Sequence, residues 1–266
     1  MHLQPVSIDQ LNKYYTHPSA ILFRFIELKA LYQGFKNTNF PKPNLDLGCG
    51  DGYISKILFD DHFTFGIDNG EAKDVQTAID QHLYKKIYLE SAAQMSIKSN
   101  SINFVFSNSV IEHIPNNQAV LSEVSRILKP QGLFLFTVPS KYFTQYLFLS
   151  NLLKRIKLNL LAKKYENYRN QKLNHYHLLD HQEWTKRLRS NKLKVIKHGY
   201  YLPKNDIKTW DLMAILIILG SFVLGKNNSQ AIINWLFRDR IRNIISHPSI
   251  INPDQGGSLF ILAQKT

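Results

Sequence analysis

Three glycines separated by single residues occur in the stretch NLDLGCGDGYISKIL, at residues 44–58. An acid, Asp46, precedes them, and Asp68 ends the next apolar run. Glycines at such a point let the backbone approach a ligand that a Cβ atom would keep away. A dinucleotide site would need G-x-G-x-x-G, but Tyr53 occupies the third glycine position, and Asp51 would bring negative charge close to a pyrophosphate. The stretch therefore indicates a ligand without phosphate.

Residues 46–52 resemble motif I of the class I S-adenosylmethionine-dependent methyltransferases, D/E-x-G-x-G-x-G, whose cofactor carries a sulfonium and an ammonium group. The resemblance implies that Asp46 accepts a hydrogen bond from the methionyl ammonium group, directly or through water. It also implies that Asp68 binds both ribose hydroxyls, which suits a carboxylate with two acceptor oxygens. A tight turn without a ligand is the alternative for the loop. The loop residues expected beside the cofactor are Asp46, Gly48, Cys49, Gly50 and Gly52.

Residues 89–140 are similar to the methyltransferase type 11 group over their whole length. In that group a loop after the third strand borders adenine, and here this loop contains Ser91 and Ala92. Ser91 occupies the place of an acid that commonly pairs with the adenine amino group, so we expect backbone and apolar contacts to hold adenine. The sequence IEH at 111–113 matches an L-E-H element. Gln131 replaces the first glycine of an L-K-P-G-G turn, a change that is harmless if its φ is negative.

The elements that must position these residues alternate between strand and helix, as in a parallel sheet covered by helices. The sequence predicts an α/β fold: a Rossmann-like, mostly parallel seven-stranded sheet with helices on both faces, and helical insertions after strand five and between strands six and seven. The predicted strands are residues 45–49, 64–68, 87–91, 102–110, 133–139, 192–202 and 256–266. The predicted helices are residues 6–33, 51–61, 72–86 (helix or loop), 116–129 and 181–191.

We expect one methyltransferase domain over residues 1–266, and its parts differ in composition. An N-terminal helical segment (1–40) precedes the cofactor-binding core (41–140), and two helical segments that face the substrate or a membrane follow (141–182 and 203–256).

The second helical segment contains thirteen residues without a charge, 212–224. As a helix they rise about 20 Å, less than the roughly 30 Å of a bilayer core, which argues against a transmembrane span. Two interpretations remain: a buried helix of a substrate lid, or an apolar surface with basic flanks that lies on anionic lipid.

Methyl transfer from a sulfonium needs alignment and, for a weakly acidic acceptor, a base, but no metal. We expect no metal site, since no third ligand accompanies the histidines of NHYHLLDHQEW. His175 and His177 point the same way if this stretch is extended, and they are the candidate base and its helper. Ordinary polar packing beside a helix capped by Asp180 is the alternative. Asn108, at the end of the fourth strand, is expected to line the cofactor pocket or to cap the strand.

The composition limits partners and location. A net charge of +13 favours an anionic partner, either nucleic acid or an acidic membrane surface, although solubility alone would also explain it. The single cysteine, Cys49, excludes an internal disulfide. The N-terminus lacks the apolar run of a signal peptide, so we expect a cytoplasmic protein, with membrane association left open.

The function predicted from these features is transfer of a methyl group from S-adenosyl-L-methionine to a small-molecule or lipid-like acceptor, at oxygen. Residues 107–110 lack the [D/N]-P-P-[Y/F] element of enzymes that methylate amino groups of nucleobases or glutamine. The alternatives are an RNA or protein methyltransferase, and a cofactor-binding module without catalysis. Basic residues that alternate with leucines disfavour nucleic acid as the partner.

Overall fold

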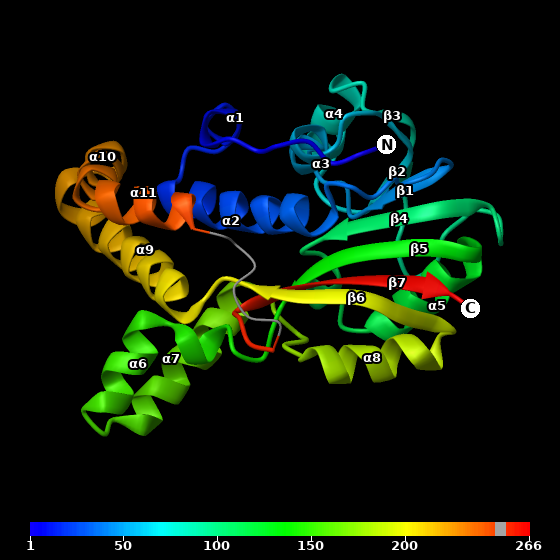
Figure 1. Ribbon diagram of the computed structural model, residues 1–266. Coiled ribbons are helices and arrows are strands. Elements are labelled where there is room, and N and C mark those ends of the chain that lie inside the picture. Colours follow the sequence, from blue (N-terminus) through cyan, green and yellow to red (C-terminus); the bar gives the residue numbers. More distant parts are fainter. Residues whose placement is uncertain (248–253) are drawn as a thin grey trace.

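A computed structural model describes residues 1–247 and 254–266, and its centre is one seven-stranded sheet (Figure 1). The strand order is β3-β2-β1-β4-β5-β7-β6, and only β7 runs antiparallel to its neighbours. This confirms the predicted Rossmann-like, mostly parallel sheet. The strands are β1 (Asn44–Leu47), β2 (Phe63–Asp68), β3 (Tyr84–Leu89), β4 (Ile102–Asn108), β5 (Leu128–Pro139), β6 (Leu193–Tyr201) and β7 (Ser258–Lys265).

Alternating side chains of the strands bury two separate apolar clusters, one on each face. On β4, Phe104 and Phe106 pack in the cluster that contains α2 and α3, whereas Val105 packs in the cluster that contains α5 and α8. Capping boxes at Ser7 and Asp180 begin α1 and α8, so Asp180 caps its helix as the alternative interpretation expected. The helices near the sheet are α1 (Ile8–Asn12), α2 (Pro18–Phe35), α3 (Tyr53–Leu58), α4 (Ala72–Asp80), α5 (Asn117–Ile127) and α8 (His181–Ser190).

Three local predictions are wrong. Residues 13–17 interrupt the helix expected over 6–33, and residues 128–129 begin β5 instead of ending a helix. The third concerns β3. Residues 84–86 were expected to continue a helix or loop, but they begin β3, the edge strand of the sheet. Their polar sequence misleads because an edge strand leaves side chains in solvent. The condition stated for Gln131 is not met: its φ is 65°, so the turn keeps the left-handed conformation that glycine favours, at a cost of about 1 kcal/mol.

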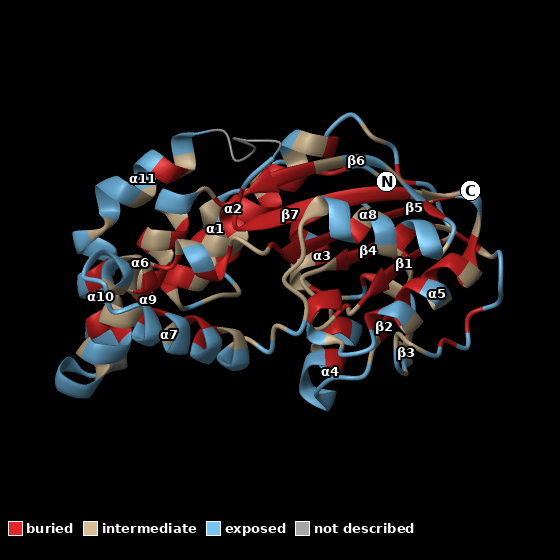
Figure 2. Cartoon of the chain, turned by 90° about the horizontal axis from the view of Figure 1, so that it is seen from below, coloured by how far each residue is buried: buried red, intermediate tan, exposed pale blue. Residues whose placement is uncertain are grey.

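Five further helices gather at one end of the molecule, beyond the strand ends (Figures 1 and 2). They are α6 (Phe148–Arg155), α7 (Asn159–Lys172), α9 (Lys204–Leu224), α10 (Lys226–Leu236) and α11 (Arg238–Ser246). α9 has 21 residues and rises about 31 Å. The helix expected from the uncharged residues 212–224 was too short, because α9 begins earlier, at Lys204. In the described part of the chain, α9 is the one helix long and apolar enough to cross a membrane, and a third of that stretch is buried.

Candidate active site

The glycine loop follows β1 and turns the chain into α3. Gly48, Gly50 and Gly52 have φ values of 76°, 49° and 78°, which L-residues with side chains rarely adopt. A Cβ atom on Gly48 would lie 2.4 Å from Val110 Cγ2, so packing requires that glycine. A Cβ atom on Gly50 would meet no described heavy atom within 4 Å. Gly50 therefore leaves room beside the backbone, as a ligand that passes close to this loop would need.

Asp68 connects this loop to a cavity of about 360 Å³. Its Oδ2 accepts a hydrogen bond from the Gly50 amide at 2.8 Å, and its Oδ1 accepts one from the Gly70 amide at 2.6 Å. Two predicted cofactor residues, Ser91 and Ala92, lie in the same wall. The cavity is lined by Gly48, Ile67, Asp68, Asn69, Glu90, Ser91, Ala92, Val110, His113, Ile114 and Pro115.

Of the nine predicted cofactor residues, Gly48, Asp68, Ser91 and Ala92 line this cavity. The other five lie outside the lining: Gly50 and Gly52 of the loop, and Asp46, Cys49 and Asn108. Asp46 is buried, and its Oδ2 accepts hydrogen bonds of 2.6 Å from Ser55 Oγ and Tyr84 OH. Burial raises the pKa of Asp46 to about 6, although these two hydrogen bonds oppose the shift. Cys49 is also buried, which raises the pKa of its thiol. Asn108 bonds to residues of α2 and β5 instead.

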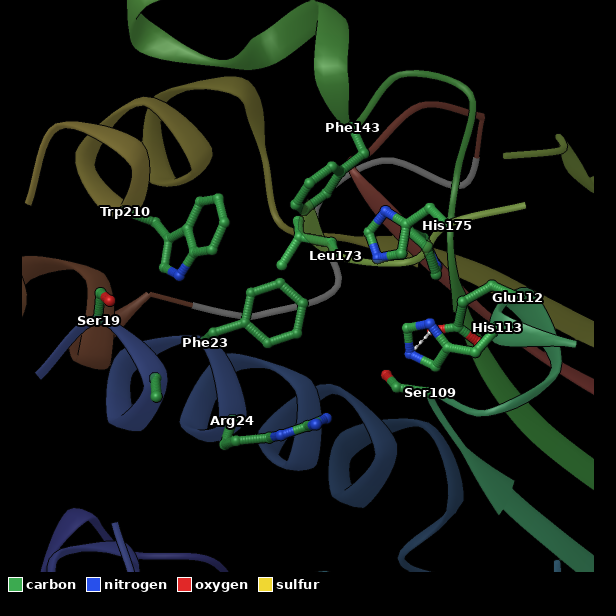
Figure 3. A pocket seen from close by; sticks show the side chains of 12 residues that line it. Ser19, Phe23, Arg24, Ser109, Glu112, His113, Phe143, Leu173, His175 and Trp210 are labelled. Carbon is green, nitrogen blue, oxygen red and sulfur yellow. Dashed lines mark ion pairs between the residues drawn. The ribbon is translucent and has the colours of Figure 1, made fainter. Parts of the chain in front are cut away.

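A second cavity, of about 260 Å³, adjoins the first at His113, which lines both. Figure 3 shows Phe23, Leu173, Phe143 and Trp210 on one side and a polar group on the other. The polar group consists of Arg24, Ser109, Glu112, His113 and His175. The elements that meet here are α2, α9, the ends of β4 and β5, and the segment after α7.

Glu27 of α2 is buried beneath the polar side of this cavity and bonds to several of the surrounding residues. Its carboxylate is fully buried and bonds to Arg24 Nη1 at 2.5 Å, Ser109 Oγ at 2.8 Å and Asn108 Nδ2 at 3.0 Å. Tyr201 OH on β6 donates a further bond at 3.0 Å. Burial alone would raise the pKa of Glu27, but the Arg24 charge and the hydrogen bonds outweigh it and lower the pKa. The sequence analysis missed this residue; an Arg-Glu pair at i and i+3 in an apolar helix was the available signal.

Glu112 and His175 are the unsatisfied polar groups of the second cavity. Glu112 Oε2 and His175 Nδ1 are buried and have no hydrogen-bond partner among the described residues. Burial raises the pKa of Glu112 to about 8. Burial, with the nearby charges of His113 and Arg169, lowers the pKa of His175 to about 4. Glu112 is thus poised to exchange a proton near neutral pH, a role that the sequence analysis did not assign.

His113 lies between these two groups. Its Nδ1 lies 3.1 Å from the Asn174 carbonyl oxygen, which only accepts, so Nδ1 carries the proton. Its Nε2 then faces Glu112 Oε1 at 3.7 Å, and its ring stacks on His175 with centroids 5.6 Å apart. Desolvation lowers the pKa of His113, which favours the neutral ring.

His177 does not share this cavity with His175. Its Nε2 lies 3.1 Å from the Ile114 carbonyl oxygen and 2.9 Å from that of Pro115. Its Nδ1 lies 3.5 Å from Arg187 Nη1. The segment 174–180 is irregular rather than a strand, so the two histidines need not share a direction. His177 thus contacts the backbone that directly follows His113.

Comparison with known proteins gives one family match, over about a third of the chain. Residues 45–136 match the family model for a methyltransferase domain. A probable S-adenosylmethionine-dependent methyltransferase of Mycolicibacterium smegmatis is 27% identical over 116 residues, which cover 42% of this chain and 44% of that protein. A ubiquinone biosynthesis O-methyltransferase of Vibrio atlanticus is 26% identical over 121 residues, covering 41% and 48%. The chain thus spans less than half the length of these relatives.

The fold as a whole is similar to solved structures. A methyltransferase of Thermotoga maritima, described as a possible histamine N-methyltransferase, superposes with a TM-score of 0.57 at 14% identity. The superposition covers 97% of this chain and 96% of that protein. At this identity the similarity establishes the fold alone, and it gives no information on the acceptor.

Proposed function

We propose that this class I S-adenosylmethionine-dependent methyltransferase, as its family match and fold identify it, methylates an oxygen atom of a small apolar acceptor. One observation carries the proposal. The cavity of about 260 Å³ has an apolar wall on one side and titratable groups on the other, and it adjoins the cavity of Asp68 at His113. Donor and acceptor would therefore meet at His113, as an in-line displacement requires.

The cofactor, when bound, supplies a methyl group on a sulfonium that a nucleophilic oxygen can displace. We assign Asp68 to the ribose hydroxyls and Ser91 and Ala92 to adenine. Gly48 and Gly50 let the backbone approach the methionyl part. Asp46 lies behind the loop, where its charge would stabilise the ammonium group directly or through water. Asn108 acts on the site through Glu27 rather than through the cofactor.

We assign the proton of the acceptor to Glu112 rather than to His175. A base works best when its pKa is near the working pH, and about 8 for Glu112 meets this condition better than about 4 for His175. With the cofactor bound, Glu112 would accept the O–H proton of the acceptor as its oxygen takes up the methyl group. His175 and His113 orient the acceptor, and His177 positions their loop.

The acceptor class follows from the size and polarity of the cavity. Its volume suits one ring-sized group, and the aromatic side chains favour a flat, apolar one. A longer apolar tail would have to leave the cavity between the helices. The Vibrio relative is named for oxygen methylation in ubiquinone biosynthesis, which agrees with an acceptor of this class. We place the reaction in the cytoplasm, within a single domain.

The test uses a cofactor with a deuterated methyl group, incubated with the protein and a host lipid and metabolite extract. We expect the label in an organic-soluble small molecule as an O-methyl group, located by mass spectrometry. Label recovered only in RNA or protein, or on nitrogen, would contradict the proposal. Asp68→Ala should abolish cofactor binding in calorimetric titrations, whereas Glu112→Gln should bind cofactor and form little product.

A further inference from the structure

The exposed apolar side chains of this protein are concentrated at its helical end. Among the described residues, fourteen of the eighteen exposed large hydrophobic side chains lie in residues 152–168 and 218–236. We call these two ranges the apolar end. In Figure 2 the helices of this end carry exposed residues beside buried ones, whereas the strands of the sheet are mostly buried. Exposed apolar side chains concentrated in this way are typical of a site of interaction.

The exposed residues on α9 and α10 form stripes at helical spacing. On α9 the stripe comprises Ile218, Leu219, Phe222 and Val223, and the last two are 83% and 82% exposed. On α10 it comprises Ile232, Trp235 and Leu236. The opposite faces are packed: Ile217 and Ile233 are buried, and Gly220 brings the two helices together at Ser229. The hairpin thus has an inner face for the fold and an outer apolar face.

The segment of α6 and α7 adds basic charge to this surface. Exposed Leu152, Ile156, Leu158, Leu160 and Leu161 alternate with Lys154, Arg155, Lys157, Lys163 and Lys164. The only acid in residues 152–168 is Glu166, which is buried against Ser150, Lys154 and Lys163. The segment therefore presents apolar side chains with a net positive charge.

We propose that the apolar end docks on the surface of an anionic lipid bilayer. Apolar side chains with basic neighbours are the combination that binds the boundary between headgroups and acyl chains. A second copy of the chain is disfavoured as the partner, because two such segments would bring like charges together. The biological role of this docking rests on the proposed function, because a bilayer would hold the apolar acceptor.

The geometry favours lying on the bilayer over crossing it. The first half of α9 is fastened to α7 through Asp211, which accepts from Tyr165 OH at 2.7 Å and pairs with Arg169 at 3.4 Å. Trp210 of the same helix lines the acceptor cavity, eight residues or about 12 Å before Ile218. Docking of the outer half of α9 would therefore bring the cavity within reach of the lipid.

The test is flotation of the full chain with vesicles of phosphatidylcholine, with and without phosphatidylglycerol. We expect binding to the anionic vesicles that weakens with salt. Phe222→Ser with Val223→Ser should reduce it at least tenfold, about 1.4 kcal/mol. The matched control is Ile79→Ser with Ile196→Ser, two residues 48% and 46% exposed outside the apolar end, which should bind as before. Lys157→Gln with Lys164→Gln should weaken binding to anionic vesicles only.

Three outcomes would overturn the proposal: no binding of the unaltered chain to anionic vesicles, equal loss in the control variant, or dimerisation that the Phe222/Val223 variant abolishes. Cofactor affinity, measured by calorimetry without vesicles, separates this result from the proposed function. A chain that binds cofactor but not vesicles refutes the docking surface alone. A chain that binds vesicles but not cofactor refutes the proposed function and leaves the docking surface in place.

Discussion

At the scale of single residues, Gly50 and Gly225 provide a controlled pair. Both have positive φ, 49° and 77°, and a Cβ atom on either would meet no described heavy atom within 4 Å. We expect both Gly50→Ala and Gly225→Ala to lower the free energy of unfolding. The loss should be larger for Gly225→Ala, on the order of 1–3 kcal/mol, because its φ of 77° and ψ of 158° are adopted almost only by glycine. Only Gly50→Ala should weaken binding of S-adenosylmethionine in calorimetric titrations, because only Gly50 lies beside Asp68. Equal cofactor affinity of the two variants would exclude the glycine loop as the contact.

Glu112 predicts a pH dependence of the reaction. Its pKa of about 8 keeps the carboxyl group protonated at pH 6, so kcat/KM of the unaltered chain should rise with pH and level off above about 8. Glu112→Gln should lower kcat/KM on the plateau and remove this rise, with cofactor affinity unchanged. A variant that retained the rise would assign the proton to another group.

The same carboxyl group predicts a pH dependence of stability. Its folded-state pKa lies above the unfolded value, so its contribution is complete below the unfolded pKa and is lost as the pH rises to about 8. Glu112→Gln should therefore stabilise the chain at pH 8, by on the order of 3 kcal/mol, and by less at pH 4.5. Urea unfolding at the two pH values measures the difference, and an equal effect at both would contradict a raised pKa.

At the scale of elements, Arg24 and Glu27 fasten α2 to β4 and β6. Arg24→Met leaves the buried Glu27 carboxylate without its counter-charge, and we expect a loss of about 3 kcal/mol at neutral pH. Adding Glu27→Gln should restore part of the loss, since a neutral amide oxygen still accepts from Ser109 and Tyr201. Denaturant unfolding of both variants tests this; a double variant no more stable than Arg24→Met would show that the charge is not the cause.

At the scale of the whole molecule, the single cysteine reports on opening of the fold. Cys49 is 8% exposed, and burial raises the pKa of its thiol, so the reactive thiolate is scarce in the folded state. We expect slow labelling by a thiol reagent in buffer, acceleration in urea in parallel with unfolding, and protection by S-adenosylmethionine. The rate of thiol modification measures this, and rapid labelling without urea would contradict it.

The local spacing of residues in the sequence was sufficient to predict much of the fold. Short apolar runs placed the seven strands, and the alternating glycines placed the loop, because both depend on neighbours within a few residues. The positions of Asp68, Ser91 and Ala92 in one cavity wall follow from the rule that parallel strands end at one edge. Residues 84–86 and Gln131 were missed because an edge strand and a left-handed turn can be formed by polar residues.

The sequence by itself determined the fold class, the glycine loop and the family of the cofactor domain. Only the tertiary structure decided which side chains line the cavity proposed for the acceptor, since Phe23, His113, His175 and Trp210 come from segments far apart in the chain. It separated His175 from His177 and brought Glu27 to Tyr201, 174 residues away. The physical reason is that burial and partners of a polar group depend on packing between distant elements, which no local pattern encodes.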